Sequence, residues 1–452
     1  MEDITRDFLN ALSEEIAGRQ DDRLKARIAE LHPADLAEIL DGIQDEEVQY
    51  LWKLIDVAER GDVLVELEED VRESLLASLT NREIAEEVLE NIDSDDAADV
   101  IGELPEDRAE KVIAALDTED REDLLTLLRY PDGTAGALMG TELIRVEMDW
   151  TVTQAIREMR KQAEDVETFH SVYVVNAAGQ LIGRLSLKRL LLTATSARST
   201  IGDLFKEDDT RTVKVDDPDE KVVQVMKKYD LVALPVVDDH NRLLGRITID
   251  DVVDLMEEEA EKDYQLASGL SDEVESDDSL WDMTRARLPW LLIGLFGGLA
   301  GAYVIGWFDI ERFPSMALFI PLIAAMGGNV GVQSAAIVVQ GLASGKSPTD
   351  AGLVPRLLKE FSVALLNGAI CACVIMGASL LLGYGWNLSL TVSMALIAVI
   401  IFAALFGTFV PLTLDKLNVD PALATGPFIT TANDIIGLII YFGIGVLMSV
   451  GG

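Results

Sequence analysis

The chain has 452 residues, of which 49% are hydrophobic and 26% are charged, and its formal net charge is −42 at pH 7. This length allows two to four domains, and the composition suggests two unlike parts joined end to end. From residue 284 onward there are seven Lys/Arg and seven Asp/Glu, so residues 1–283 hold 30 basic and 72 acidic residues and the whole negative charge. Such an acidic surface disfavours nucleic acid and anionic lipid headgroups as its partners, and it attracts cations.

The chain lacks the signals of secretion and of common catalytic machinery. Its N-terminal twenty residues have no basic segment followed by an apolar core, so no cleavable signal is predicted and the front part is expected in the cytoplasm. Cys371 and Cys373, the only two cysteines, lie in an apolar run and predict neither a disulfide nor a metal site. No phosphate-binding loop or nucleophile constellation is apparent, so we expect no enzymatic activity.

Residues 1–130 predict an acidic domain of stacked short helices. Apolar positions recur at helical spacing and are interrupted by breakers such as Leu104-Pro105. Asp95 and Asp99 are four residues apart and share one helix face, where two carboxylates repel each other unless something positive joins them. Most such pairs are merely solvated, and a divalent-cation site is the alternative.

Residues 131–200 and 201–251 contain a tandem repeat. The segment SVYVVNAAGQLIGRLSL aligns with ALPVVDDHNRLLGRITI at an offset of 62 residues, which pairs Val174 with Val236 and Gly183 with Gly245. Each copy has an amphipathic helix, a hydrophobic strand, a polar turn, a second strand and another helix. The repeat resembles a pair of CBS modules, which are small α/β units that act as sensors.

In the CBS family, the pattern Gly, two apolar residues, Thr or Ser, two others and Asp binds the ribose of a nucleotide. Gly245, Thr248 and Asp251 fit this pattern in the second module, whereas Arg189 stands where the first module would need its Asp. The resemblance therefore allows an ATP site in the second module only. A strand end followed by a helix cap is the alternative interpretation.

Residues 252–283 predict an acid-rich connecting helix and linker, too charged to enter a bilayer. Residues 284–452 predict an all-helical transmembrane domain, with five apolar runs long enough to cross at 288–308, 315–343, 357–383, 388–412 and 421–449. With the N-terminus inside, six basic residues face the cytoplasm and one lies outside; they are Arg285, Arg287, Lys346, Arg356, Lys359 and Lys416, against Arg312. The sequence therefore predicts a multi-pass protein of the plasma (inner) membrane, with a cytoplasmic N-terminus and an extracytoplasmic C-terminus.

The fifth run contains an ionisable residue, Asp434. A charge at mid-bilayer costs a few kcal/mol unless it faces a pathway, a partner or water. Thr430 and Asn433 stand beside it in the sequence, and Asn329 and Gln333 lie at mid-depth in the second run. These oxygen-bearing side chains predict a path for a hard, hydrated cation, whereas a polar residue that joins two helices is the alternative.

Magnesium fits this path better than other metals. Mg²⁺ usually keeps several waters and binds through one or two carboxylates, so two copies of Asp434 that face each other across a dimer axis would suit it. No histidine or cysteine lies near Asp434 in the sequence, which disfavours zinc and copper.

The order of these parts, together with three motifs, resembles the MgtE family of magnesium channels over essentially the whole chain. The motifs are YPDGTAGALMG at 130–140, PLIAAMGGNVGVQS at 321–334 and DPALATGPFITTAND at 420–434. The resemblance implies a homodimer with its pore on the two-fold axis. It also implies that Asp434 is the ion-selecting acid, and that Mg²⁺ is both substrate and regulator.

The resemblance implies regulatory Mg²⁺ sites as well. Asp420 matches an acid at the inner mouth that meets the connecting helix through bound Mg²⁺. Asp95 and Asp99, with Gly140 nearby, match groups that bridge the N-terminal domain to the CBS pair. The acids that match the sites of the CBS pair and connecting helix are Asp230, Asp251, Asp254, Glu259 and Asp263. Lys262 departs from the family pattern, which prefers an acid there.

Together these assignments predict a Mg²⁺ channel that carries influx down the membrane potential. At low cytosolic Mg²⁺ the acidic domains repel one another; when Mg²⁺ rises, it bridges their carboxylates and the helix at 252–267 closes the pore. Two alternatives stay open. One is an H⁺- or Na⁺-coupled carrier of divalent cations with Asp434 as a relay, and the other is a membrane-anchored CBS sensor of nucleotide or cation.

Overall fold

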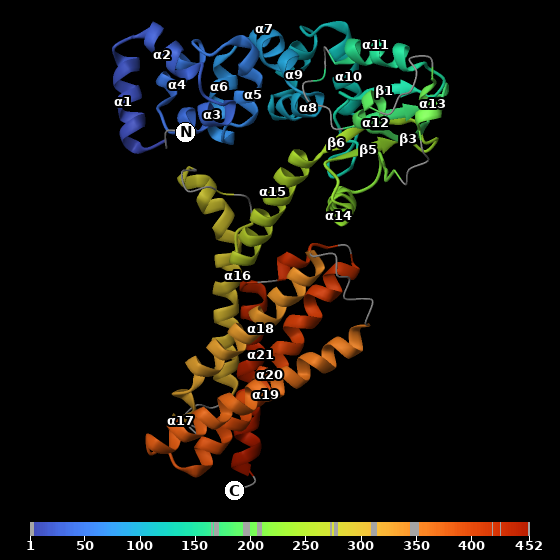
Figure 1. The fold of residues 1–452 in the computed structure, drawn as a ribbon. Helices are drawn as coiled ribbons and strands as arrows, with labels where there is room; N and C mark the ends of the chain where they lie inside the picture. The colour runs from blue at the N-terminus through green and yellow to red at the C-terminus, as the bar shows by residue number, and fades with distance from the viewer. Residues whose placement is uncertain are drawn as a thin grey trace. The chain divides into compact units, whose positions relative to one another are not determined.

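The computed structural model describes residues 4–163, 166, 171–192, 199–205, 210–271, 274, 279–308, 314–343, 352–417, 419–424 and 426–450. Arg312 and Lys346, which entered the count of basic residues, lie outside them. The chain divides into two compact units, Met1–Asp254 and Leu255–Gly452 (Figure 1). The first unit holds the predicted N-terminal domain and the repeat, and the second holds most of the connecting helix and all the predicted spans.

Short helices build the first part of the first unit, as predicted. Their apolar faces meet in one core that buries Leu36, Leu51 and Trp52 completely or nearly so. Local caps fix the start of several of these helices; Thr80 and Glu83, for example, form a reciprocal capping box at the start of α7. The α-helices are α1 (Arg6–Ala17), α2 (Asp21–Ile28), α3 (Pro33–Asp41), α4 (Asp45–Trp52), α5 (Arg60–Val65), α6 (Glu69–Ser78), α7 (Asn81–Glu83), α8 (Ser94–Glu103), α9 (Glu106–Ile113) and α10 (Thr118–Leu127), with shorter turns η1 (Val57–Glu59), η2 (Ile84–Val88) and η3 (Leu89–Asn91).

The tandem repeat forms two three-stranded sheets of the same topology, β1-β2-β3 and β4-β5-β6. In each sheet the first pair of strands is parallel and the second antiparallel. The register repeats as well, because Val174 faces Gly183 in one sheet and Val236 faces Gly245 in the other, as the sequence alignment predicts. The elements are β1 (Ile144–Glu147), α11 (Val152–Gln162), β2 (Val172–Val175), β3 (Leu181–Leu185), α12 (Leu187–Leu192), α13 (Ile201–Leu204), β4 (Val213–Lys214), α14 (Asp219–Tyr229), β5 (Ala233–Val237) and β6 (Leu243–Thr248).

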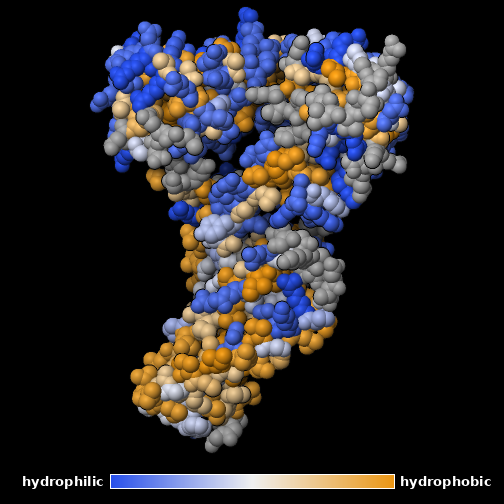
Figure 2. Space-filling model, in the orientation of Figure 1, coloured by the Kyte–Doolittle hydropathy of each residue, from blue (hydrophilic) through white to orange (hydrophobic). Residues whose placement is uncertain are grey.

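Five helices of the second unit are long and apolar enough to cross a membrane, within the residues described. Figure 2 shows the hydrophobic surface that gathers on these helices, in contrast to the hydrophilic surface of the first unit. The helices of this part are α15 (Ile249–Ser268), α16 (Leu280–Trp307), α17 (Pro314–Ala317), α18 (Ile320–Ala343), α19 (Leu353–Leu381), α20 (Trp386–Lys416), η6 (Pro421–Ala424) and α21 (Pro427–Val450). Helix α20 packs against α18, α19 and α21 and carries much of the core, including Val399 and Ile400.

The predicted five spans are present, with differences at their ends. The fifth was expected to begin at 421, but a short η6 turn occupies 421–424 and α21 begins at Pro427. The backbone explains this break, because Gly426 adopts a left-handed φ of 58° and proline suits the first helical position. The first span was expected at 288, but α16 starts at Leu280, where Ser279 caps it.

Candidate cation-binding sites

Helices α18 and α21 line a cavity of about 310 Å³ in the second unit. Its walls combine one carboxylate with neutral polar and small side chains. They are Ala324, Ala325, Gly328, Asn329, Val332, Gln333, Thr430 and Asp434. The structure therefore brings Asp434 and Thr430 of α21 together with Asn329 and Gln333 of α18.

Helical periodicity decides which residues of α21 reach the cavity. Thr430 and Asp434 are four residues apart and share a face. Thr431 turns toward α16, where its side chain lies 2.0 Å from the place that a Cβ on Gly297 would take. Asn433 turns toward α18 and is only 1% exposed. Asn433, predicted as a pore residue, is therefore not among the residues that line this cavity.

Glycines allow α18, α20 and α21 to approach one another behind the cavity. A Cβ on Gly331 would lie 1.9 Å from Nδ2 of Asn433, and a Cβ on Gly407 would lie 2.3 Å from the carbonyl oxygen of Gly331. Real side-chain carbons do not approach other atoms this closely, so both positions require glycine at this helix spacing. Gly331 of α18 and Gly407 of α20 thus allow close helix packing.

Asp420 directly precedes the η6 turn that leads into α21, and it lies near Asp263 in the last part of α15. Its Oδ1 accepts a hydrogen bond of 2.7 Å from the backbone N–H of Ala422. Asp263 of α15 is close enough for Asp420 to raise its pKa, although burial is the larger cause of that rise. Two carboxylates that oppose each other here form an electrostatically unfavourable pair that a cation would relieve.

The end of α15 packs directly against the start of α21. A Cβ on Gly426 would lie 2.6 Å from the carbonyl oxygen of Ala267, and one on Gly269 would lie 2.7 Å from the ring of Pro427. Both glycines have a positive φ. The hydroxyl of Thr430 and its backbone N–H donate to the carbonyl of Gly426 at 3.0 and 3.1 Å. The connecting helix therefore contacts the helix that carries Asp434, one turn before Thr430.

The sequence analysis passed over one acid in the spans, Glu360 of α19. Ser334 of α18, which is 5% exposed, donates a 2.7 Å hydrogen bond to its Oε1. Ser334 follows Gln333 by one residue but lies outside the cavity lining. Glu360 thus joins α18 to α19, and only its position inside the predicted third span, 357–383, could have indicated it.

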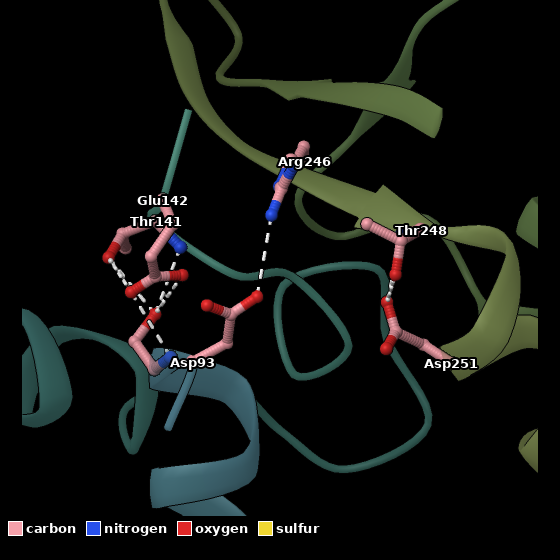
Figure 3. A network of polar contacts seen from close by, with 7 residues as sticks. Asp93, Thr141, Glu142, Arg246, Thr248 and Asp251 are labelled. Carbon is pink, nitrogen blue, oxygen red and sulfur yellow. Dashed lines mark hydrogen bonds and ion pairs between the residues drawn. The ribbon is translucent and has the colours of Figure 1, made fainter. Parts of the chain in front are cut away.

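In the first unit, a second cluster of acids gathers where α8 meets the strands of the repeat (Figure 3). Carboxylate oxygens of Asp93, Asp95 and Glu142 lie within 4.8 Å of one another. Ser94 begins α8 and fixes Glu142 through its backbone N–H and its hydroxyl, both at 3.1 Å. Arg246 of β6 is only 4% exposed and its Nη2 lies 3.4 Å from Oδ2 of Asp93.

The predicted residues of this region converge on the same cluster. A Cβ on Gly140 would lie 3.1 Å from Oδ2 of Asp95, and Gly140 pairs with Arg246 through two backbone hydrogen bonds of 2.9 Å. Asp251 is the nearby charge that most raises the pKa of Asp95. Asp99 lies one turn further along α8, with Glu103 and Arg72 as its strongest charged neighbours.

Burial and mutual repulsion raise the pKa values of these carboxyls. Burial is the largest cause for each, and it raises the pKa of Asp93 to about 6 and that of Asp96 to about 7. For Asp93 the next cause is the charge of Glu142, and Arg246 opposes it. The pKa of Asp95 is raised well above its usual value, first by burial and then by Asp251 and Asp96. The cluster therefore binds positive charge favourably, whether as protons or as a cation.

The cluster fits a hard divalent cation. Oδ1 of Asp95 is buried and has no hydrogen-bond partner among the described residues. All three converging side chains offer carboxylate oxygens, which Mg²⁺ and Ca²⁺ prefer. Asp93, Asp95 and Glu142 would hold such an ion, and it would cancel repulsion that Arg246 offsets only in part.

The remaining predicted ligands are spread out. Asp230 is exposed and adopts a left-handed φ of 50° at the end of α14. Asp254 is exposed, and Glu259 and Asp263 are half-buried along α15. Asp420, another predicted acid, is among the charges that raise the pKa of Asp263, after burial.

The three residues predicted for a nucleotide are engaged with the protein. A Cβ on Gly245 would lie 2.6 Å from the carbonyl oxygen of Gly140, so the backbone of the Met139–Gly140 segment covers it. Oδ2 of Asp251 accepts hydrogen bonds from the hydroxyl and the backbone N–H of Thr248, at 2.6 and 2.8 Å (Figure 3). This pattern is that of a helix cap, the alternative named above.

These observations define a multi-pass membrane protein with a polar intramembrane cavity and an acidic soluble unit that contains a CBS pair. Sequence comparison agrees: residues 320–444 match the family described as "Divalent cation transporter", residues 31–133 match the "MgtE intracellular N domain", and residues 135–194 and 201–258 match the CBS domain. The chain belongs to the MgtE family.

Curated relatives match most of the chain, and a solved structure matches about half of it. The chain is 32% identical over 421 residues to the magnesium transporter MgtE of Bacillus subtilis, which covers 92% of both chains. It is 31% identical over 432 residues to that of Thermus thermophilus, which covers 94% of this chain and 95% of that one. A crystal structure of the cytosolic domain of the Mg²⁺ channel MgtE in complex with ATP is 31% identical, with a TM-score of 0.50, and covers 55% of this chain and 99% of that one.

Proposed function

We propose that this protein is a Mg²⁺ channel that admits the ion across the plasma (inner) membrane, with the cavity at Asp434 as part of its path. The observation that carries the proposal is the cavity itself, which places one carboxylate beside Asn329, Gln333 and Thr430 inside membrane-spanning helices. One acid with neutral oxygens suits an ion that keeps most of its water. The magnesium transporters among the relatives support the choice of ion.

A homodimer completes the path. Asn329 and Gln333 are exposed at mid-span in the isolated chain, although polar side chains are unfavourable against lipid. A second copy placed across a two-fold axis would cover them and would bring a second Asp434 to the same ion. The two carboxylates would then bind hydrated Mg²⁺ from opposite sides.

Cytosolic Mg²⁺ closes this channel through the acidic unit and α15. Bound ions at Asp93, Asp95 and Glu142 would hold the N-terminal domain against the CBS pair, with Asp99, Gly140 and Asp251 close by. Ions at the acids of α15, and between Asp263 and Asp420, would fix that helix beside the inner mouth. Because Ala267 and Gly269 press on Gly426 and Pro427, a shift of α15 would reach Thr430 and Asp434 through α21.

The charge distribution of the spans supports the orientation, with the N-terminus in the cytoplasm and the C-terminus outside. Influx then needs no fuel, because two charges moved down an inward-negative potential of 100 mV release about 4 to 5 kcal/mol. The relatives are named as transporters, in line with the expected lack of enzymatic activity.

Flux into proteoliposomes tests this function. With a K⁺-clamped negative interior and no gradient of H⁺ or Na⁺, the wild type should admit Mg²⁺ at a rate that follows the membrane potential. An absolute requirement for an opposing H⁺ or Na⁺ gradient would establish the coupled carrier instead. Absence of any Mg²⁺ flux, together with nucleotide binding, would favour the membrane-anchored sensor.

Nucleotide binding by the CBS pair is a second candidate function, favoured by the ATP complex of the related cytosolic domain. In this chain Thr248 and Asp251 bond to each other, so ATP at these residues and Gly245 would have to displace that contact. Calorimetric titration of ATP into the wild type and Thr248→Val tests whether ATP binds at Thr248 or elsewhere in the CBS pair. Equal affinity would place the nucleotide elsewhere in the CBS pair.

A further inference from the structure

A second, apolar groove lies on the membrane unit, away from the cavity that contains Asp434. It has a volume of about 460 Å³ and opens between α19 and α20. Its lining includes Val354, Leu358 and Phe361 of α19 and Phe402, Phe406 and Phe409 of α20. None of these side chains belongs to the buried core of the unit.

Side-chain size explains why the groove opens where it does. In the middle of the pair the helices touch, because a Cβ on Gly368 would lie 3.4 Å from Cα of Ile397, and the hydroxyl of Ser393 donates to the carbonyl of Ala372 at 3.2 Å. Toward the start of α19 and the end of α20, large side chains replace these small ones. The rings of Phe402 and Phe406 stack at 5.6 Å and form one wall.

The groove ends at one membrane surface. Only four residues separate α19 from α20, so the two helices run antiparallel and the start of α19 lies level with the end of α20. From Val354 to Phe361 the groove follows seven residues, about 10 Å of helix. One leaflet of the hydrocarbon core is about 15 Å thick, so the groove accommodates most of an acyl chain.

Positive groups lie toward the mouth of the groove, beside the half-buried acid Asp415 of α20. Helix α19 begins there after Gly352 with no acid in its first turn, so its free N–H groups carry the positive end of the helix dipole. Lys416, in the last turn of α20, is exposed and lies two turns from Phe409 on the same face. The nearest acid on α19, Glu360, is engaged by Ser334 of α18.

We propose that this groove is a binding site for an anionic phospholipid. One acyl chain lies between α19 and α20, and the phosphate lies at the start of α19 beside Lys416. Basic pockets between transmembrane helices commonly bind anionic headgroups in this way. The proposal requires only that α19 and α20 span the membrane and is independent of which ion the protein carries.

Native mass spectrometry of the full-length protein tests the site. Purified protein receives equal amounts of palmitoyl-oleoyl phosphatidylglycerol and phosphatidylcholine. We expect the wild type to retain the anionic lipid on the order of fivefold more strongly, the contribution of one well-placed lysine. Lys416→Gln should bring the ratio close to one, and Leu358→Trp, which fills the groove, should lower the retention of both lipids.

Lys359→Gln is the control for loss of a lysine charge, because Lys359 lies on the opposite face of α19 from Val354 and Phe361. It should keep the wild-type ratio. A wild-type ratio of one, or equal losses in Lys416→Gln and Lys359→Gln, would overturn the proposal. Efficient disulfide formation between two copies of Phe409→Cys would also overturn it, since a second protein chain would then occupy the groove.

Discussion

The two acidic regions of this protein differ in how many carboxylates they bring together. The cavity of the membrane unit has Asp434 alone, surrounded by neutral oxygens, whereas the cluster of the soluble unit brings Asp93, Asp95 and Glu142 within 4.8 Å of one another. A single acid attracts a hydrated cation and lets it leave. Several converging carboxylates bind a cation more firmly, because the cation cancels their mutual repulsion. In the proposed function, the cavity would carry the ion and the cluster would measure its concentration.

The largest expected effect is on the cavity. Asp434→Asn keeps the size and removes the charge, so we expect Mg²⁺ flux in proteoliposomes to fall on the order of a hundredfold. Unit charges 4 Å apart interact by about 4 kcal/mol at an effective dielectric of 20, and retained water reduces that figure. Asp415→Asn, at the end of α20 and outside the cavity lining, is the control and should conduct normally.

The next effect concerns the packing that holds the cavity in shape. Gly331→Ala would put a Cβ 1.9 Å from Asn433, and overpacking of this kind typically costs about 1 to 3 kcal/mol. We expect a lower thermal unfolding midpoint in detergent and reduced flux. Gly377→Ala, on α19 with no atom within 4 Å of the new Cβ, should be neutral, and equal losses in both variants would contradict the packing argument.

A smaller effect is expected from the cluster. Asp95→Asn removes the carboxylate with the buried, unpartnered oxygen. The Mg²⁺ concentration that protects the soluble unit from protease should rise about tenfold, while Na⁺ of equal ionic strength protects neither protein. Unchanged Mg²⁺ dependence would mean that the ion does not bind at this cluster. Conduction through the cavity should be unaffected, which separates the two regions.

The smallest effect is a pH dependence without Mg²⁺. The pKa values of Asp93 and Asp96 are raised to about 6 and about 7, above the usual 3.8. The contact between the N-terminal domain and the CBS pair therefore binds protons more tightly than the two domains do when they are separated. The contact should therefore weaken as pH rises from 5 to 8 and tighten as it falls. Limited proteolysis in chelator should show several-fold slower cleavage at pH 5.5 than at pH 8. The double variant Asp93→Asn/Asp96→Asn should show a smaller difference, because Asp95 and Asp99, whose pKa values are also raised, remain.

Local patterns in the sequence predicted much of this architecture. Alternation and repeat register placed the strands of the CBS pair, and apolar length located five spans. The spacing of Thr430 and Asp434 puts both on one face of α21, whereas the neighbouring Asn433 does not line the cavity, because a step of one residue turns the side chain by about 100°. Backbone breaks at Gly426 and a cap at Ser279 then shifted two helix ends.

Contacts between distant segments could not be predicted in this way. The sequence pointed to Asp95, Asp99 and Gly140, yet it missed Glu142 and Arg246, which reach the cluster from the segment before β1 and from β6. Arg246 lies 153 residues from Asp93, and no local pattern joins them. Glu360 was passed over because its partner, Ser334, belongs to a different helix.

Single-channel recording of two variants tests the division of roles most directly. Under one set of conditions, with Mg²⁺ as the only permeant cation, Asp434→Asn should show almost no current. Asp95→Asn should show wild-type conductance that persists at Mg²⁺ concentrations that close the wild type. If Asp434→Asn conducts as the wild type does, Mg²⁺ does not pass by way of Asp434. If Asp95→Asn loses conduction and keeps its closure, the cluster around Asp95 does not sense Mg²⁺.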